Sequence, residues 1–106
     1  MRSLFQILDD IGYDVMIHQI IGQDPYTLAI RGLVIGRNRQ KPNEYAVWST
    51  FDWSQAGPKD RKRGIDVQWG TYSLKSYEEA YQLMCKKAYE LRTNYTWLEP
   101  GTKKEM

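Results

Sequence analysis

The 106-residue sequence is poor in the residue types that build metal sites and nucleophilic catalytic sites. It contains one cysteine, Cys85, and one histidine, His18. A single cysteine excludes an intramolecular disulfide and leaves too few thiolates for a structural zinc site. No partner for a general base accompanies His18, and Cys85 falls well inside a predicted helix, away from its N-terminus. We therefore expect His18 on a sheet surface, Cys85 as a small packed hydrophobe, and no catalytic residue.

Long apolar runs and nucleotide-binding motifs are also missing. No apolar run approaches the ~18 residues of a membrane span, and Asp9 and Asp10 interrupt the N-terminal apolar segment, which is therefore unlike a signal peptide. The glycines form neither GxGxxG nor GxxxxGK, and Asp9, Asp10 and Asp14 lack calcium-loop spacing. These absences predict a small soluble, cytoplasmic (intracellular) protein that is not an enzyme and has no cofactor, no metal and no membrane partner.

Apolar and aromatic residues, in contrast, are abundant enough for a real core. Hydrophobic residues make up 42% of the chain and aromatic residues 13%. A chain of this length predicts one domain, which we place over residues 1–99. The polar residues that follow Glu99 predict a disordered tail over 100–106.

The hydrophobic pattern predicts an α+β fold. Ser3 and Gln6 form a capping-box pair that begins a short helix, and Ser76 and Glu79 form a second pair that begins a long one. Between these helices, apolar residues alternate over 13–21, 26–36 and 44–53, and more briefly over 65–73, with polar turns at 22–25 and 37–43. The order α-β-β-β-β-α predicts an antiparallel meander of three to four strands. We expect both helices to pack on one face of this sheet and to leave the other face wet.

Alternation then assigns the aromatic residues to faces. If Val47 points inward, Trp48 points outward, beside Arg31 and His18. In WGTYS (69–73), burial of Trp69 under the last helix is the favoured interpretation and an exposed, binding Trp69 is the alternative. A buried Trp69 would place Tyr72 on the same face as Trp48.

Positive charge is concentrated in the middle of the chain, although the net charge is only +2. Residues 37–63 contain seven basic and three acidic residues, the basic ones being Arg37, Arg39, Lys41, Lys59, Arg61, Lys62 and Arg63. Successive turns of a meander lie at opposite ends of the sheet, so the 37–42 turn and the 54–64 loop should be ~30 Å apart. Two small patches could contact nucleic-acid phosphates or an acidic protein partner, or could be solvated turns.

The segment 44–92 resembles small accessory proteins of bacterial phages and mobile elements in its strand EYAVWSTFDW, its basic loop, its WGTYS and its capped helix. The resemblance implies action by binding, since some of these proteins inhibit host defence systems, anti-CRISPR proteins among them; it transfers no site residue. The helix–strands–helix order over 3–92 is also similar to double-stranded-RNA-binding domains. Residues 76–79 are Ser-Tyr-Glu-Glu where those domains carry lysines, so RNA binding is not carried over.

We therefore predict a non-enzymatic binding module that contacts a protein or nucleoprotein partner through an exposed sheet face and the basic loops. The alternative is a nucleic-acid-binding protein that uses the 37–41 and 59–63 loops. A homodimer formed through an edge strand stays open. The candidate binding residues are Arg31, Arg37, Arg39, Lys41, Trp48, Lys59, Arg61, Lys62, Arg63 and Tyr72.

Overall fold

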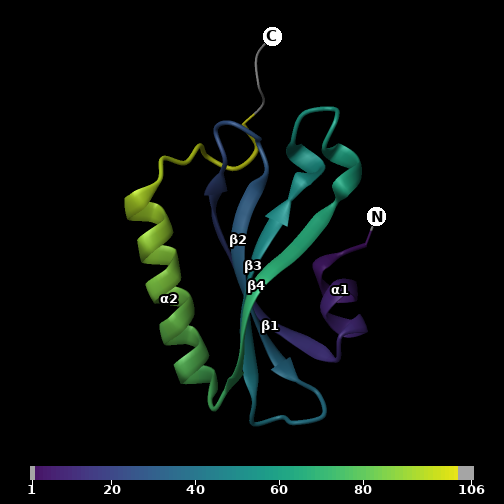
Figure 1. Ribbon diagram of the computed structural model, residues 1–106, viewed down its shortest axis with the longest axis vertical. Helices are drawn as coiled ribbons and strands as arrows, with labels where there is room; N and C mark the ends of the chain where they lie inside the picture. The colour runs from purple at the N-terminus through teal and green to yellow at the C-terminus, as the bar shows by residue number, and fades with distance from the viewer. Residues whose placement is uncertain (1, 103–106) are drawn as a thin grey trace.

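The computed structural model describes residues 2–102, which form a four-stranded antiparallel sheet with a helix at each end of the chain (Figure 1). Of the tail predicted over 100–106, residues 103–106 lie outside the described part. The elements are α1 (Leu4–Asp10), β1 (Tyr13–Gln23), β2 (Ile30–Asn38), β3 (Tyr45–Asp52), β4 (Ile65–Leu74) and α2 (Tyr77–Asn94). The strands neighbour one another in chain order, β1-β2-β3-β4. The predicted α-β-β-β-β-α meander is confirmed.

Both helices begin at the predicted caps. The Ser3 hydroxyl accepts a hydrogen bond from the Gln6 backbone N–H, and the Gln6 side chain accepts one from the Ser3 N–H, which completes the capping box. The Ser76 hydroxyl accepts a hydrogen bond from the Glu79 N–H at the start of α2. These side chains satisfy backbone donors that a helix cannot satisfy internally, so the caps determine where each helix starts.

The strand boundaries differ from the predicted ones near the first turn. Tyr26–Ala29 do not belong to β2, because the Asp24 carboxylate accepts hydrogen bonds from the backbone N–H groups of Tyr26 and Thr27. Such a side-chain bond offers the backbone an alternative to strand pairing. Pairing of β2 begins only at Ile30, opposite Gln23.

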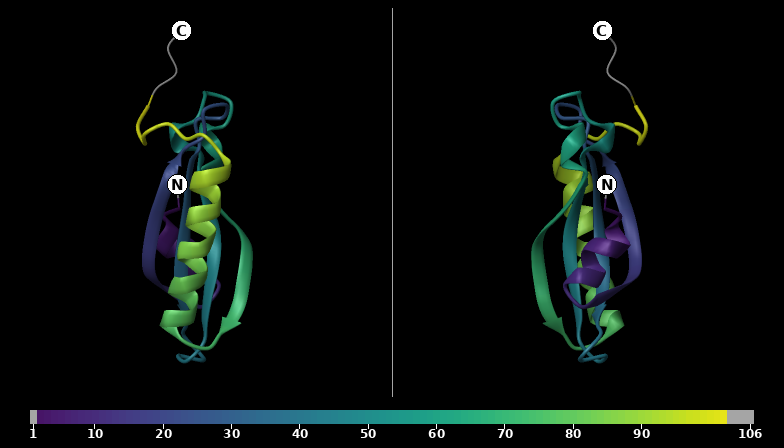
Figure 2. Two further views of the ribbon diagram at one scale, coloured as in Figure 1. Left: turned by 90° about the vertical axis from the view of Figure 1, so that its left-hand side faces the viewer. Right: turned by 90° about the vertical axis from the view of Figure 1, so that its right-hand side faces the viewer.

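The two helices lie on opposite faces of the sheet, so the prediction that both pack on one face is wrong (Figures 1 and 2). The sequence of β2 explains this arrangement. Leu33, Val34 and Ile35 are consecutive and all fully buried, whereas neighbouring strand residues point to opposite faces. A strand that is apolar on both faces needs a cover on each side.

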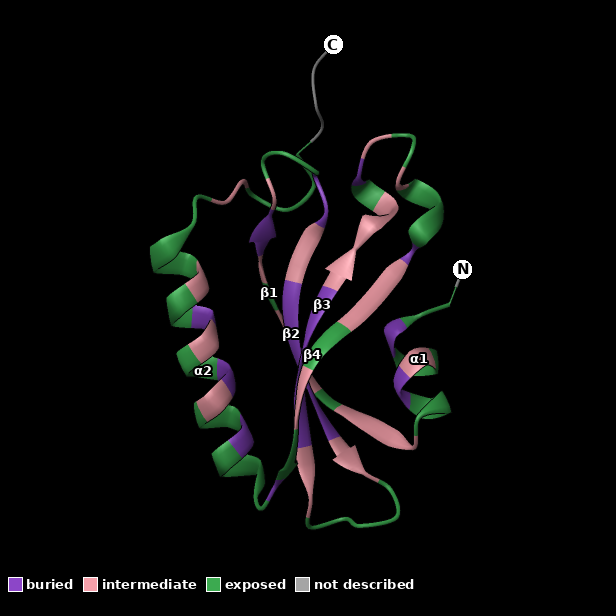
Figure 3. Ribbon diagram, in the orientation of Figure 1, coloured by how far each residue is buried: buried purple, intermediate pink, exposed green. Residues whose placement is uncertain are grey.

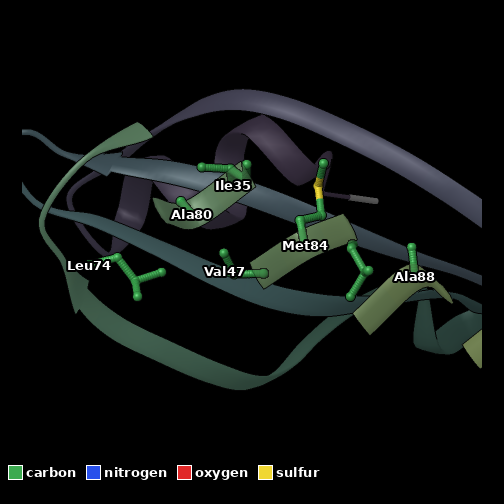
Figure 4. Close-up of a cluster of buried hydrophobic side chains, with 7 residues drawn as sticks. Ile35, Val47, Leu74, Ala80, Met84 and Ala88 are labelled. Carbon is green, nitrogen blue, oxygen red and sulfur yellow. The ribbon is translucent and has the colours of Figure 1, made fainter. Parts of the chain in front are cut away.

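Each helix closes its own hydrophobic core. Figure 4 shows the larger core, between α2 and the sheet, which consists of Leu33, Ile35, Val47, Leu74, Ala80, Met84 and Ala88. The smaller core lies beneath α1 and consists of Leu4, Leu8, Val34, Ala46 and Trp48. Burial is accordingly concentrated in the two central strands and on the inner sides of the helices (Figure 3).

The connections lie at two ends of an elongated molecule. The β2–β3 turn lies at one end, and the β1–β2 turn and the β3–β4 loop lie together at the other (Figure 1). The β3–β4 loop contains two short 3-10 helices, η1 (Trp53–Gln55) and η2 (Arg61–Arg63). The segment after α2 returns to this second end, where Leu98 forms an isolated bridge with Gln23. The two predicted basic segments are therefore at opposite ends of the sheet, as the meander requires.

Candidate binding site

Trp48 is buried, which corrects the prediction that it points outward as a contact residue. Its side chain is only 2% exposed and lies between two glycines on the neighbouring strands, Gly36 of β2 and Gly70 of β4. A Cβ atom on either glycine would come within 2.7 Å of the indole. Tyr13 packs edge-on against the ring, at 4.9 Å between centroids. Helix α1 covers the face on which the sequence analysis expected Trp48 to meet solvent.

Strand β4 forms one edge of the sheet and contains two irregularities. Trp69 and Gly70 together oppose Trp48, and Tyr72 and Ser73 together oppose Ala46. Each extra residue defines a β-bulge. Trp69 and Ser73 have φ values of 55° and 60°, in the left-handed region that non-glycine residues rarely adopt. The bulges therefore hold two side chains in conformations that a regular strand would not allow.

The first bulge presents Trp69 to solvent. Trp69 is 64% exposed, so the favoured prediction that it packs under the last helix is wrong and the alternative of an exposed aromatic is correct. Its ring packs edge-on against Phe51, at 5.3 Å between centroids. The Arg31 guanidinium lies 4.4 Å from the Phe51 centroid and 5.1 Å from that of Trp69. Both aromatic rings thus hold the arginine by cation–π contacts.

Arg31 and Trp69 line a pocket of about 340 Å³ between the sheet and the C-terminal half of α2. The β strands contribute Arg31, Leu33, Ser49 and Trp69, and α2 and the residue after it contribute Lys87, Glu90, Leu91, Asn94 and Tyr95. Arg31 faces this side because residues two apart on a strand point to the same face, so Arg31 shares the face of Leu33. Trp48 is opposite Val34 in the register and points to the other face. The expected patch of Trp48 beside Arg31 therefore does not form, since the sheet separates the two residues.

The electrostatic environment of Arg31 is unusual for an arginine. Its Nη2 donates one long hydrogen bond, 3.4 Å, to the Ser49 hydroxyl, and its Nε is buried without a partner among the described residues. Burial lowers the pKa of Arg31, against the opposing influence of Tyr95 and Asp24. Because its reference pKa is far above neutrality, Arg31 remains charged.

Tyr72, on the opposite face of β4, remains a contact candidate. It is 54% exposed, and its hydroxyl oxygen accepts a hydrogen bond of 2.9 Å from the Trp48 indole N–H. Its ring lies edge-on to Trp48, at 5.6 Å between centroids. Tyr72 therefore shares a face with Trp48 although Trp69 is exposed, and only Tyr72 meets solvent. Strand β4 exposes one large aromatic residue on each of its two faces.

The basic stretch 59–63 is partly engaged within its own loop. Arg63 lies over the Trp53 ring, 3.8 Å from its centroid, and its Nη2 is 3.3 Å from the Asp66 carboxylate. Arg61 donates a hydrogen bond of 3.1 Å from Nε to the Ala56 carbonyl. Lys59 and Lys62 are exposed, and within residues 2–102 neither forms an ion pair. Two of the four basic side chains are thus free to meet a partner.

The basic residues at the β2–β3 end of the molecule also differ from one another in their contacts and burial. Arg39 bridges two carboxylates, with Nη2 2.6 Å from Asp9 and 3.0 Å from Asp14, and hydrogen bonds to Asp14 and then Asp9 raise its pKa. Asp9 and Asp14 therefore tie the β2–β3 turn to α1 and β1. Arg37 is half-buried, and Lys41 is exposed.

The two reactive side chains lie apart from the pocket. His18 lies on the exposed surface of β1, as predicted, and its Nε2 is 2.9 Å from the Thr50 hydroxyl. Partial burial of the ring against the sheet lowers its pKa, and Asp52 opposes the shift. Cys85 is exposed on α2, so the prediction of a packed hydrophobe is wrong. It follows the buried Met84 and hence points away from the core.

Comparisons with protein-family models, curated proteins and solved structures find no match. Among residues 2–102, no three His, Cys, Asp or Glu side chains gather in a way that could hold a metal ion. No helix in the same range is both long and apolar enough to cross a membrane.

Proposed function

We propose that the protein is a non-enzymatic binding module that contacts a protein or nucleoprotein partner along the outer edge of the sheet, at β4. The observation that carries the proposal is the exposure of Trp69, at 64%, on a left-handed bulge. Exposed tryptophan is scarce on surfaces that meet only water and enriched at the centres of interfaces. Strained backbone also gathers at functional sites.

The residues around Trp69 have the chemistry of an interface centre. Arg31 belongs, with tryptophan, to the residue types that dominate binding energy at protein interfaces. Tyrosine is a third such type, and Tyr72 is exposed on the opposite face of the same edge strand. Trp69 and Arg31 are held by mutual contacts and by Phe51, so ordering them on binding costs little conformational entropy. Lys59 and Lys62, on the loop that precedes β4, supply a positive rim suited to an acidic partner.

The partner contacts side chains of β4 and does not extend the sheet. A peptide that adds a strand to an edge needs a regular row of free N–H and C=O groups. The two bulges interrupt that row, as is typical of edges protected against pairing. The same geometry disfavours a homodimer formed through β4.

The alternative function, nucleic-acid binding through the 37–41 and 59–63 loops, receives less support. Arg39 and Arg63 are already paired with carboxylates, so fewer side chains remain to neutralise phosphates. The two loops lie at opposite ends of the molecule (Figure 1), which separates the exposed Lys41 from Lys59 and Lys62. The resemblance to phage accessory proteins makes a host defence complex, such as a CRISPR effector, the kind of partner that we propose.

A peptide selection tests the proposal. A random library is selected on the wild-type protein, and enriched peptides are titrated against Trp69→Ala and against Tyr26→Ala. Tyr26 is a matched control because it is 90% exposed but lies in the β1–β2 turn. We expect at least about tenfold weaker binding to Trp69→Ala, which corresponds to ~1.4 kcal/mol, and unchanged binding to Tyr26→Ala. Peptides that bind Trp69→Ala as well as wild type would contradict the proposal.

A salt titration tests the alternative. Mixed-sequence single- and double-stranded DNA is titrated at low and moderate salt against wild type and a Lys59/Arg61/Lys62/Arg63→Ala variant. Affinity that falls steeply with salt and disappears in the variant would favour nucleic-acid binding over the proposed function. We expect weak binding at low salt and none at moderate salt.

A further inference from the structure

Arg31 is a partly buried cation that no carboxylate in the described part of the chain neutralises. No ion pair joins it to a carboxylate of residues 2–102. Phe51 and Trp69 pack against its guanidinium, and its Nε is buried with no hydrogen-bond partner among residues 2–102. A partly buried guanidinium without an anion loses hydration that nothing replaces, so an anion that reaches it forms a charge-assisted hydrogen bond at a favourable place.

The pocket gives an anion access to this guanidinium. Arg31 lines the 340 Å³ space directly, a volume within the range of small-ligand sites. The other charged groups that line it are Lys87 and Glu90 of α2, which carry opposite charges. The net charge of the lining is therefore one positive charge. A monoanion neutralises this lining, whereas a doubly charged phosphate would leave a net negative charge in the pocket.

The uncharged lining selects a flat apolar neighbour for that anion. Trp69 and Tyr95 offer aromatic surface, and Leu33 and Leu91 form an apolar floor. Ser49 and Asn94 add neutral hydrogen-bonding groups. A carboxylate matches the planar, two-donor edge of a guanidinium, and an adjoining aromatic group would cover the Trp69 ring.

We propose that the pocket between β2, β4 and α2 binds a carboxylate that adjoins an aromatic group, with Arg31 as its charge partner and Trp69 as its aromatic wall. On the proposed function, this group is the anchor that a protein partner inserts, as a C-terminus or as an acidic side chain next to an aromatic one. The biological meaning of the pocket rests on that function. Its chemistry does not, because small molecules are enough to test it.

The experiment uses N-acetylphenylalanine as the probe, with N-acetylphenylalanine amide and phenyl phosphate as comparators. Each is titrated into ¹⁵N-labelled protein while the Arg31 Nε–H and Trp69 indole N–H signals are followed by NMR. The amide keeps the ring and removes the charge. We expect saturable shifts of both signals with the acid, at least about tenfold weaker binding of the amide, and weaker binding of phenyl phosphate than of the acid.

Arg31→Gln and Arg37→Gln provide the matched variants. Arg37 lies on the same strand and the same face, and its Nε is likewise buried with no partner among residues 2–102. Arg37 lies outside the pocket, because in the β2–β3 register it is opposite Tyr45, at the far end of the sheet. We expect binding of the acid to be lost in Arg31→Gln and kept in Arg37→Gln. If Arg31→Gln does not fold, the comparison of acid with amide on wild type decides alone.

Several results would overturn the inference. They are equal binding of acid and amide, tighter binding of phenyl phosphate, shifts outside the pocket only, and no saturation with any probe. Failure of the wider function gives a different pattern. The acid would still bind in an Arg31-dependent manner, while no selected peptide would depend on Trp69.

Discussion

Replacing Trp48 by alanine should greatly destabilise the protein. The side chain is 2% exposed, and it contacts glycines of both neighbouring strands, the Tyr13 ring and helix α1. Truncation of a buried tryptophan costs about 3–5 kcal/mol in lost burial and in the cavity left behind. The lost hydrogen bond to the Tyr72 hydroxyl adds little, because Tyr72 is 54% exposed and water can replace the indole N–H. Against a typical total of about 5–15 kcal/mol, the loss is a large share of the stability.

Urea unfolding followed by far-UV circular dichroism measures this loss. The control is Trp69→Ala, which removes the same atoms from a side chain that is 64% exposed. We expect the control to lose only about 1 kcal/mol, the contribution of the contacts with Phe51 and Arg31. A loss below about 1 kcal/mol for Trp48→Ala, or equal losses for the two variants, would refute burial of Trp48 beneath α1. A loss of stability below about 1 kcal/mol is typical of substitutions at surface residues.

Three further predictions concern stability. Gly70→Ala places a Cβ 2.6 Å from the Trp48 ring, whereas a Cβ at Gly57 meets nothing within 4 Å. By urea unfolding, we expect Gly70→Ala to lose about 1–3 kcal/mol of stability and Gly57→Ala to lose almost none. The pKa of His18 is lowered in the folded state, so as pH falls below ~6.5 the unfolded chain binds a proton first and the free energy of unfolding decreases. His18→Gln should flatten that decrease. An equally steep decrease in the variant would contradict the lowered pKa of His18. Arg39→Met removes the ion pairs with two aspartates, so it should be less stable than wild type at low salt, and the difference should shrink at high salt because these pairs are exposed.

The order and type of the elements could be predicted because the signals are local. The capping pairs Ser3/Gln6 and Ser76/Glu79 mark the helix starts with side chains that lie three residues apart. Period-two alternation and short polar turns predict a meander, since consecutive antiparallel strands usually pair. The separation of the two basic segments follows from the same topology.

The placement of the helices depends on a signal that the sequence contains but that alternation alone does not reveal. Leu33, Val34 and Ile35 form an unbroken apolar run, which is typical of a strand buried on both faces. Ala46, Val47 and Trp48 form a second run on β3, and all three are fully buried or nearly so. Strict alternation assigns one apolar face to each strand, so it does not reveal these runs and wrongly predicts that Trp48 faces solvent.

The candidate site was largely beyond prediction from the sequence. The sequence predicts Arg31 as a binding residue, but its contacts with Phe51 and Trp69 depend on the bulge, which moves the register of β4 by one residue. A left-handed conformation at Trp69 leaves no trace in the sequence, because the glycine that usually marks such a bulge is absent at that position. Tyr95 and Lys87 reach the pocket only through the packing angle of α2, which is a tertiary property.

The distribution of tryptophan between the two cores has a spectroscopic consequence. Trp48 belongs to the core beneath α1, whereas the core beneath α2 consists of aliphatic side chains, alanine and methionine. Helix α1 has only seven residues, and so short an element can open at less free energy than the whole domain. Departure of α1 would let water and soluble quenchers reach the Trp48 indole while α2 stays in place. Fluorescence quenching of Trp48, in a variant whose other tryptophans are replaced by phenylalanine, would therefore measure the opening of one layer of the molecule separately from its global unfolding.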